Sequence, residues 1–67
     1  MESFQKGDIV RLLDRPLGHP SKIKAVIIGF IEDNIFSVII LNGMRKGDVK
    51  KIRSFEVKKE SDIYEED

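Results

Sequence analysis

Positive charge gathers in one stretch of this 67-residue chain, at residues 45–59. The whole chain is neutral, with 12 basic and 12 acidic side chains, but this stretch holds seven basic and two acidic ones, a balance of 7 − 2 = +5. Cations at this density can track a phosphate backbone, and each neutralised phosphate adds a salt-dependent increment of affinity. The sequence therefore predicts a site for nucleic acid or another partner, formed by Arg45, Lys46, Lys50, Lys51, Arg53 and Phe55.

The same stretch has two other interpretations, namely a surface for a charged protein partner and a solvated strand whose lysines protect a sheet edge from aggregation. Strand geometry would place Lys51 and Arg53 on one face and Lys50 on the other, so the cations do not form a single stripe. Phe55 is the ring that would lie beside the positive charge if it were exposed, although a core position is the favoured interpretation of this residue.

An acidic segment follows the basic stretch directly. Residues 60–67 hold five acidic side chains and no basic one. A short charged segment with few apolar side chains cannot offset the entropy of ordering, so we predict a folded domain at residues 1–59 and a disordered, flexible acidic tail at residues 60–67. Whether the tail covers the basic face is left open by the sequence.

No group of residues forms a convincing catalytic or metal site. His19 with Asp14 or Asp33 is the nearest approach to an acid–base pair, but nucleophilic catalysis also needs an oriented Ser or Cys and an oxyanion site. Residues 32–34 lack the spacing of a calcium loop, and the glycines do not form a phosphate loop. We expect a protein that is not an enzyme, with no cofactor, no metal and no small-molecule substrate.

Short strands separated by turns dominate the pattern, and no amphipathic helical stripe is present. The sequence predicts strands at residues 9–13, 22–31 and 35–41, an eight-residue Pro/Gly loop at 14–21, and a bend or bulge at Gly29. The Asn42-Gly43 pair predicts a tight hairpin turn, after which residues 44–46 can begin a fourth strand. The last strands fall at residues 49–52 and 55–58. The predicted core includes Ile27, Phe30, Phe36, Ile39 and Met44.

Residues 5–59 resemble the SH3-like small β-barrels in their opening Lys6-Gly7-Asp8-Ile9-Val10-Arg11-Leu12, their loop, their bent strand and their ending Ile52-Arg53-Ser54-Phe55-Glu56-Val57. The opening looks like the first strand of KOW-type modules in ribosomal and transcription-elongation proteins. A fainter similarity links residues 52–57 to the second signature of Sm-like RNA-binding proteins. The resemblance implies an all-β, five-stranded barrel.

These observations favour a non-enzymatic accessory or regulatory module that contacts nucleic acid, or a machine that handles it, through the basic face. The alternative is a protein–protein interaction adaptor that docks on a larger assembly through the loop Pro16–Pro20 or an open strand edge. Residues 1–6 lack the basic and apolar segments of a secretory signal, and the chain has no cysteine, so we expect a soluble cytoplasmic protein without membrane contact. The oligomeric state is not predicted.

Overall fold

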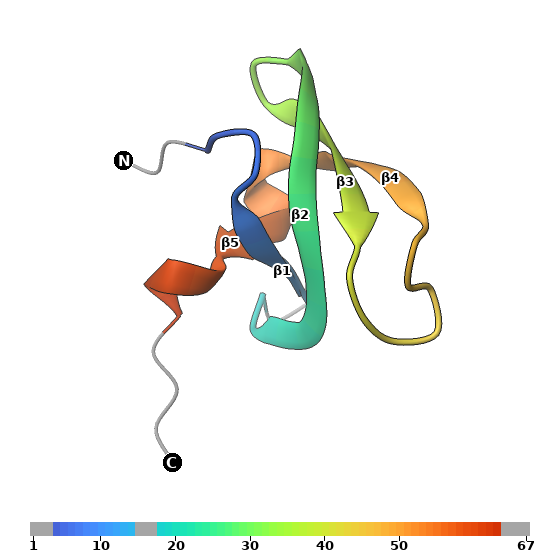
Figure 1. The fold of residues 1–67 in the computed structure, drawn as a ribbon. Helices are drawn as coiled ribbons and strands as arrows, with labels where there is room; N and C mark the ends of the chain where they lie inside the picture. The colour runs from blue at the N-terminus through green and yellow to red at the C-terminus, as the bar shows by residue number, and fades with distance from the viewer. Residues whose placement is uncertain (1–3, 15–17, 64–67) are drawn as a thin grey trace.

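The described residues form five β-strands and two single-turn 3-10 helices (Figure 1). The computed structural model describes residues 4–14 and 18–63. The elements are β1 (Ile9–Leu13), β2 (Pro20–Glu32), β3 (Ile35–Ile40), β4 (Val49–Arg53), η1 (Ser54–Glu56), β5 (Val57–Lys59) and η2 (Glu60–Asp62). The predicted all-β class is confirmed, and no α-helix occurs in the described part of the chain. None of its helices is long and apolar enough to cross a membrane.

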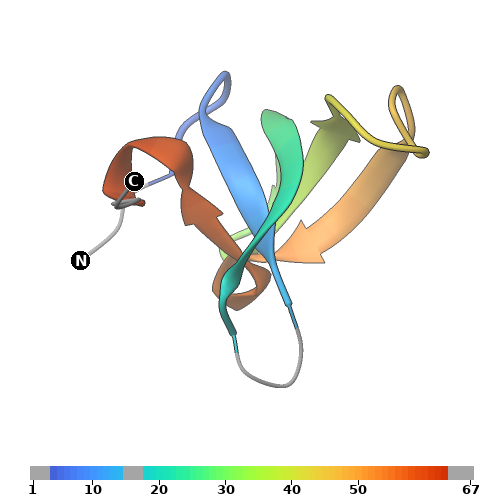
Figure 2. The ribbon, with the colours of Figure 1, turned by 90° about the horizontal axis from the view of Figure 1, so that it is seen from below.

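All five strands belong to one antiparallel sheet with the order β4-β3-β2-β1-β5. The two outer strands, β4 and β5, are joined through η1, and Figure 2 shows the sheet bent so that they meet at this end. No ladder joins β4 to β5 among the described residues, so the sheet has two edges and is not closed by hydrogen bonds. The predicted number of strands is correct. β4 lies at one edge of the sheet.

One face of the sheet carries the core. The register places Ala25 opposite both Val10 and Ile40, and Ile27 opposite Val38, and all of these side chains are buried. Because side chains alternate between faces along a strand, this register puts every second residue of the central strands into one cluster. The buried cluster consists of Val10, Ala25, Ile27, Phe36, Val38, Ile40, Ile52 and Val57, with Phe4, Leu12 and Ile23 packed against it.

β2 is longer than predicted at both ends. Its ladder with β1 continues to the pair Leu13↔Pro20, which is possible because proline is tolerated as the first residue of a strand. The predicted bulge is confirmed, since the register with β3 shifts between Ile27 and Gly29. The loop between β1 and β2 is correspondingly shorter than the predicted residues 14–21, and residues 15–17 lie outside the described part of the chain.

The connection between β3 and β4 differs from the predicted tight hairpin. Residues 41–48 form a longer turn, and β4 begins at Val49, so the strand expected at residues 44–46 is wrong. The physical reason is the Asn42 side chain, whose Oδ1 accepts from the Lys24 N–H at 2.9 Å and whose Nδ2 donates to the Lys22 carbonyl at 3.0 Å. Asn42 thus bonds to the backbone of β2 in place of a further β3 residue, and Gly43 and Gly47, both at positive φ, turn the chain back.

The connection between β4 and β5 also differs from the prediction. A closing strand was expected at residues 55–58, but Ser54–Glu56 form η1 and β5 starts at Val57. The Arg53 N–H donates to Glu56 Oε2 at 2.9 Å, and the Ser54 N–H donates to the Asn34 carbonyl at 2.8 Å. These bonds hold the 3-10 turn against the end of the β2–β3 hairpin.

Three of the predicted core residues lie elsewhere. Phe30 is 50% exposed and Met44 is 105% exposed, because Phe30 lies beyond the bulge at the end of β2 and Met44 lies in the long turn. Ile39 is partly exposed, since it alternates with the buried Val38 and Ile40 and faces the opposite side of the sheet. Ile27 and Phe36 are buried as predicted.

The first residues of the predicted acidic tail follow β5 without a break. Residues Glu60–Asp62 form η2, and the Ile63 N–H donates to the Glu60 carbonyl at 3.2 Å. Residues 64–67 lie outside the described part of the chain.

The difference between the two isoleucines gives a stability test. Replacing Ile27 with Ala should lower the free energy of unfolding by about 2–5 kcal/mol, because it empties part of the core. Replacing Ile39 with Ala should cost less, since part of that side chain already contacts water. Urea unfolding followed by circular dichroism measures both, and Ile27→Val, at about 0.5–1.5 kcal/mol, covers the case in which the larger truncation does not fold. Equal losses at the two positions would contradict the assignment of faces.

Candidate binding surface along β4

The predicted cations follow the free edge of the sheet. Lys50, Lys51 and Arg53 lie on β4, and Arg45 and Lys46 lie in the turn that leads into it. We call these five residues the basic edge. All five are exposed, and within β4 only Ile52 is buried. β4 pairs with β3 on one side, and no strand of the described residues pairs with its other side (Figure 1).

The strand divides its cations between two faces, as its sequence predicted. Lys51 lies opposite Ser37 and Arg53 lies opposite Ile35, both on the face away from the core. Lys50 lies opposite the buried Val38, on the core side. Positively charged side chains therefore lie on both faces of the sheet at this edge.

Several other cations of the protein form ion pairs. Arg11 and Lys24 contact Glu60, and Lys59 contacts Asp8 at 3.5 Å. Among the ion pairs between described residues, none includes a member of the basic edge. An anion that binds this edge consequently does not have to displace a carboxylate from any of those pairs.

Phe55 stands at one end of the basic edge. It lies on η1, directly after β4, and 68% of the residue is exposed, so the core alternative for this ring is wrong. One open pocket beside it is lined by Leu12, Leu13, Lys50, Ile52 and Arg53, among others. An exposed ring within reach of Arg53 and Lys50 is the arrangement that base stacking next to a phosphate requires.

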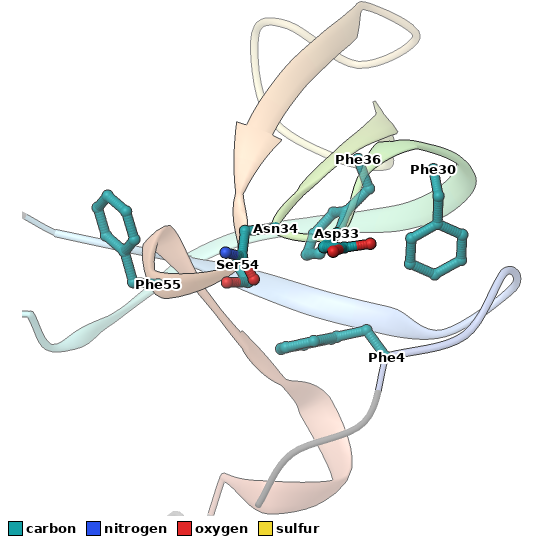
Figure 3. Close-up of a pocket in the computed structure, with 7 residues that line it drawn as sticks. All are labelled: Phe4, Phe30, Asp33, Asn34, Phe36, Ser54 and Phe55. Carbon is teal, nitrogen blue, oxygen red and sulfur yellow. The ribbon is translucent and has the colours of Figure 1, made fainter.

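A second pocket, of about 430 Å³, lies at the same end of the sheet and was not predicted from the sequence (Figure 3). Phe4 packs on Phe36 with a centroid distance of 5.2 Å, and Phe30 meets Phe36 edge to face at 5.8 Å. Figure 3 shows these three rings on one side of Asn34 and Ser54, with Phe55 on the other side. The only sequence signal for this pocket is that Phe30 and Phe36 flank the same tight turn.

The aromatic pocket has a carboxylate in its lining and a lysine ammonium group nearby. Asp33 is part of its lining, and the Lys59 ammonium stands over the Phe4 ring at 5.8 Å from its centroid. Because Phe4 contacts Phe36 as well as Lys59, its ring is already engaged by the protein itself. We therefore assign Phe4 a structural role, in closing the end of the core.

Glu60 joins the C-terminal turn to the sheet. Its carboxylate accepts two hydrogen bonds from Arg11, from Nε and Nη2, each at 2.9 Å, and Lys24 Nζ lies 3.8 Å from Oε1. The hydrogen bond from Arg11 lowers the pKa of the Glu60 carboxyl below its ordinary value of 4.5, and Lys24 adds to this effect. The sequence did not predict this contact, because the partners are separated by 49 positions.

Comparison of the chain with protein-family models, with curated proteins and with solved structures finds no match.

The Glu60 contact predicts a difference in acid stability. A lowered pKa in the folded state means that the ionised carboxylate stabilises the fold above about pH 4.5 and that this contribution is lost as the pH falls through the folded-state pKa. The variant Glu60→Gln should therefore be less stable than the parent at pH 7, and the difference should vanish in stronger acid. Thermal unfolding at a series of pH values measures it. Asp33→Asn, at an exposed turn, controls for removal of a surface charge. A gap that persists unchanged into strong acid would contradict the ion pair.

Proposed function

We propose that this chain is a non-catalytic accessory or regulatory module of the SH3-like small-barrel kind, which contacts nucleic acid, or a machine that handles it, through the basic edge and Phe55. The five-stranded antiparallel sheet and the 3-10 turn between its last two strands are compatible with such a barrel. Fold alone does not define what a module binds, so the proposal rests on the site.

One observation carries the proposal. Arg45, Lys46, Lys50, Lys51 and Arg53 are exposed along one free strand edge, outside the ion pairs of the described residues, and an exposed ring stands at its end. A row of this kind suits a ligand with regularly repeated negative charge. Phosphates supply that charge, and the bases beside them supply flat apolar surfaces for Phe55.

The positions of the cations favour contact with the ligand backbone over recognition of sequence. Lysine and arginine side chains on a strand edge can reach phosphates without entering a groove, and phosphate contacts carry no direct sequence information. We therefore expect binding with little sequence preference and with a strong dependence on salt.

The first binding test removes Lys50, Lys51 and Arg53 together by substitution with Ala. If each contacts one phosphate, the slope of log K against log salt should become shallower by about 2 to 3, because about 0.7 to 0.9 counterions are released for each phosphate neutralised. Fluorescence anisotropy of labelled single-stranded and duplex oligonucleotides at several salt concentrations measures the slope.

The matched control removes the same amount of charge elsewhere. Lys6, Lys22 and Lys58 lie outside the basic edge, and their triple substitution with Ala gives the same net charge. This control should retain most of the affinity and slope. If both triple variants lose affinity equally, only the net charge matters and the basic edge is not the site.

Phe55 is tested separately. The variant Phe55→Leu keeps an apolar side chain but removes the aromatic ring, and stacking of one base contributes about 1–3 kcal/mol. Affinity for single-stranded oligonucleotides should fall by the corresponding factor, and affinity for duplexes, whose bases are already stacked, should hardly change. Equal effects on both ligands would exclude stacking by this ring.

A protein-interaction adaptor is the second candidate function, and a separate observation favours it. Several apolar side chains stay exposed on a chain this small, among them Ile9, Phe30, Ile31, Leu41, Met44, Val49 and Phe55. Exposed apolar patches commonly mark interaction sites. Of the predicted docking loop Pro16–Pro20, only residues 18–20 are described. Capture from a lysate with and without nuclease separates the two functions, because only the nucleic-acid function loses its partner on digestion.

A further inference from the structure

A row of aliphatic side chains crosses the face of the sheet that lies away from the core. Its four members stand opposite one another in consecutive strand pairs, from β1 through β2 and β3 to β4: Ile9, Val26, Ile39 and Val49. We call them the outer apolar row. Ile9 is 38% exposed and Val49 is 61% exposed, and Val26 and Ile39 are partly exposed between them.

This row breaks the usual pattern of a sheet that faces water on one side. Antiparallel strands with one solvated face alternate apolar and polar residues, whereas strands that are covered on both faces are apolar throughout. Residues 25–28 of β2 are Ala-Val-Ile-Ile, and residues 38–40 of β3 are Val-Ile-Ile. The two central strands thus have the composition of strands that are covered on both faces, although only one face carries the core.

Positive charge borders the outer apolar row on both sides. Arg11 stands opposite Lys24 and Lys58, next to the β1 and β2 members of the row. Beyond Val49, Lys51 and Arg53 lie on the same face of β4. Glu60 already pairs with Arg11 and Lys24 at the first of these borders, so Lys58 is the cation there that lies outside the ion pairs of the described residues.

The positions of these cations indicate the kind of partner that the surface fits. A partner with carboxylates on both sides of an apolar stripe complements the charge at both borders. The row spans three strand spacings, about 14 Å, which is the length of a helix of about ten residues.

We propose that the outer apolar row is a docking surface for an amphipathic, acidic helix of a partner protein. The apolar stripe of the helix lies along the row, and its flanking carboxylates face Lys58 on one side and Lys51 on the other. The proposal does not depend on nucleic-acid binding by the basic edge, although Lys51 and Arg53 border both surfaces.

The test uses a synthetic peptide of about 14 residues, with Leu at i, i+3, i+4 and i+7 spacing and Glu on both flanks of the stripe. One control peptide has Lys in place of Glu, and a second has Ser in place of Leu. Titration into the isotopically labelled full chain, followed by amide and methyl resonances, should perturb Ile9, Val26, Ile39 and Val49 with the acidic peptide only. The variant Val49→Ser should weaken this binding about tenfold, a loss in the range expected for one buried aliphatic side chain.

Two further variants keep the test independent of folding and of the proposed function. Ile9→Ser removes the opposite end of the row and should weaken peptide binding by a similar factor. Met44→Ser removes an apolar side chain that is 105% exposed outside the row, and it should bind the peptide as the parent does. Because Val49→Ser leaves every charge in place, it should also retain the oligonucleotide affinity of the parent, so failure of one proposal does not imply failure of the other.

Several results would overturn the proposal. These are equal binding of the Lys peptide, perturbations confined to the Phe30 or Phe55 pockets, and the absence of any change at millimolar peptide. If the resonances of the row change with protein concentration in the absence of peptide, a second copy of the chain covers the row. If the same resonances change when residues 64–67 are deleted, again in the absence of peptide, the chain's own terminus covers the row.

Discussion

The fold depends on the pairing of β2 with β3. This ladder sets Ala25 opposite Ile40 and Ile27 opposite Val38, so the two longest strands contribute their alternate residues to one buried layer. The neighbouring strands extend that layer, with Val10 of β1 opposite Ala25 and Ile52 of β4 opposite Phe36. A slip of one residue would turn the set to the opposite face, and the chain has no disulfide that could compensate. The bulge between Ile27 and Gly29 is consequently as important as any buried side chain, because it sets which residues beyond it face inward.

The same pairing determines where charge can lie. In β4 only Ile52 is needed to complete the core, which leaves the other positions of the strand to Val49 and three cations. Lysines on an edge strand also discourage pairing with other chains. Protection of the edge and binding of an anion are compatible roles, since a polyanion engages the side chains and leaves the backbone of β4 solvated. The two roles differ in what they require of Phe55, because an exposed ring contributes nothing to protection of the edge.

The sequence predicted those parts of the fold that follow from local patterns. Alternation and branched side chains located the strands, Gly29 located the bulge, and period-two geometry placed Lys51 and Arg53 on one face and Lys50 on the other. The errors arose where a nonlocal contact decides the outcome. Asn42 appeared to be half of a tight hairpin turn, but its side chain bonds to the backbone of β2 and lengthens the connection, which leaves Met44 in solvent. Phe30 and Phe36 had the same apolar surroundings in sequence, and only the register distinguishes the exposed ring from the buried one.

The outer apolar row shows why register also matters for function. Its members come from four different strands, and along each of these strands the member alternates with a buried or charged neighbour, so no window of sequence contains the row. Burial within the monomer accounts for part of Val26 and Ile39, which are only partly exposed, but not for Val49, which is 61% exposed at the end of the row. The flanking cations keep such a surface hydrated and attract an oppositely charged partner. Under the two proposals, the basic character of this small sheet serves one purpose at its edge and another on its face, and the two surfaces meet at Lys51 and Arg53.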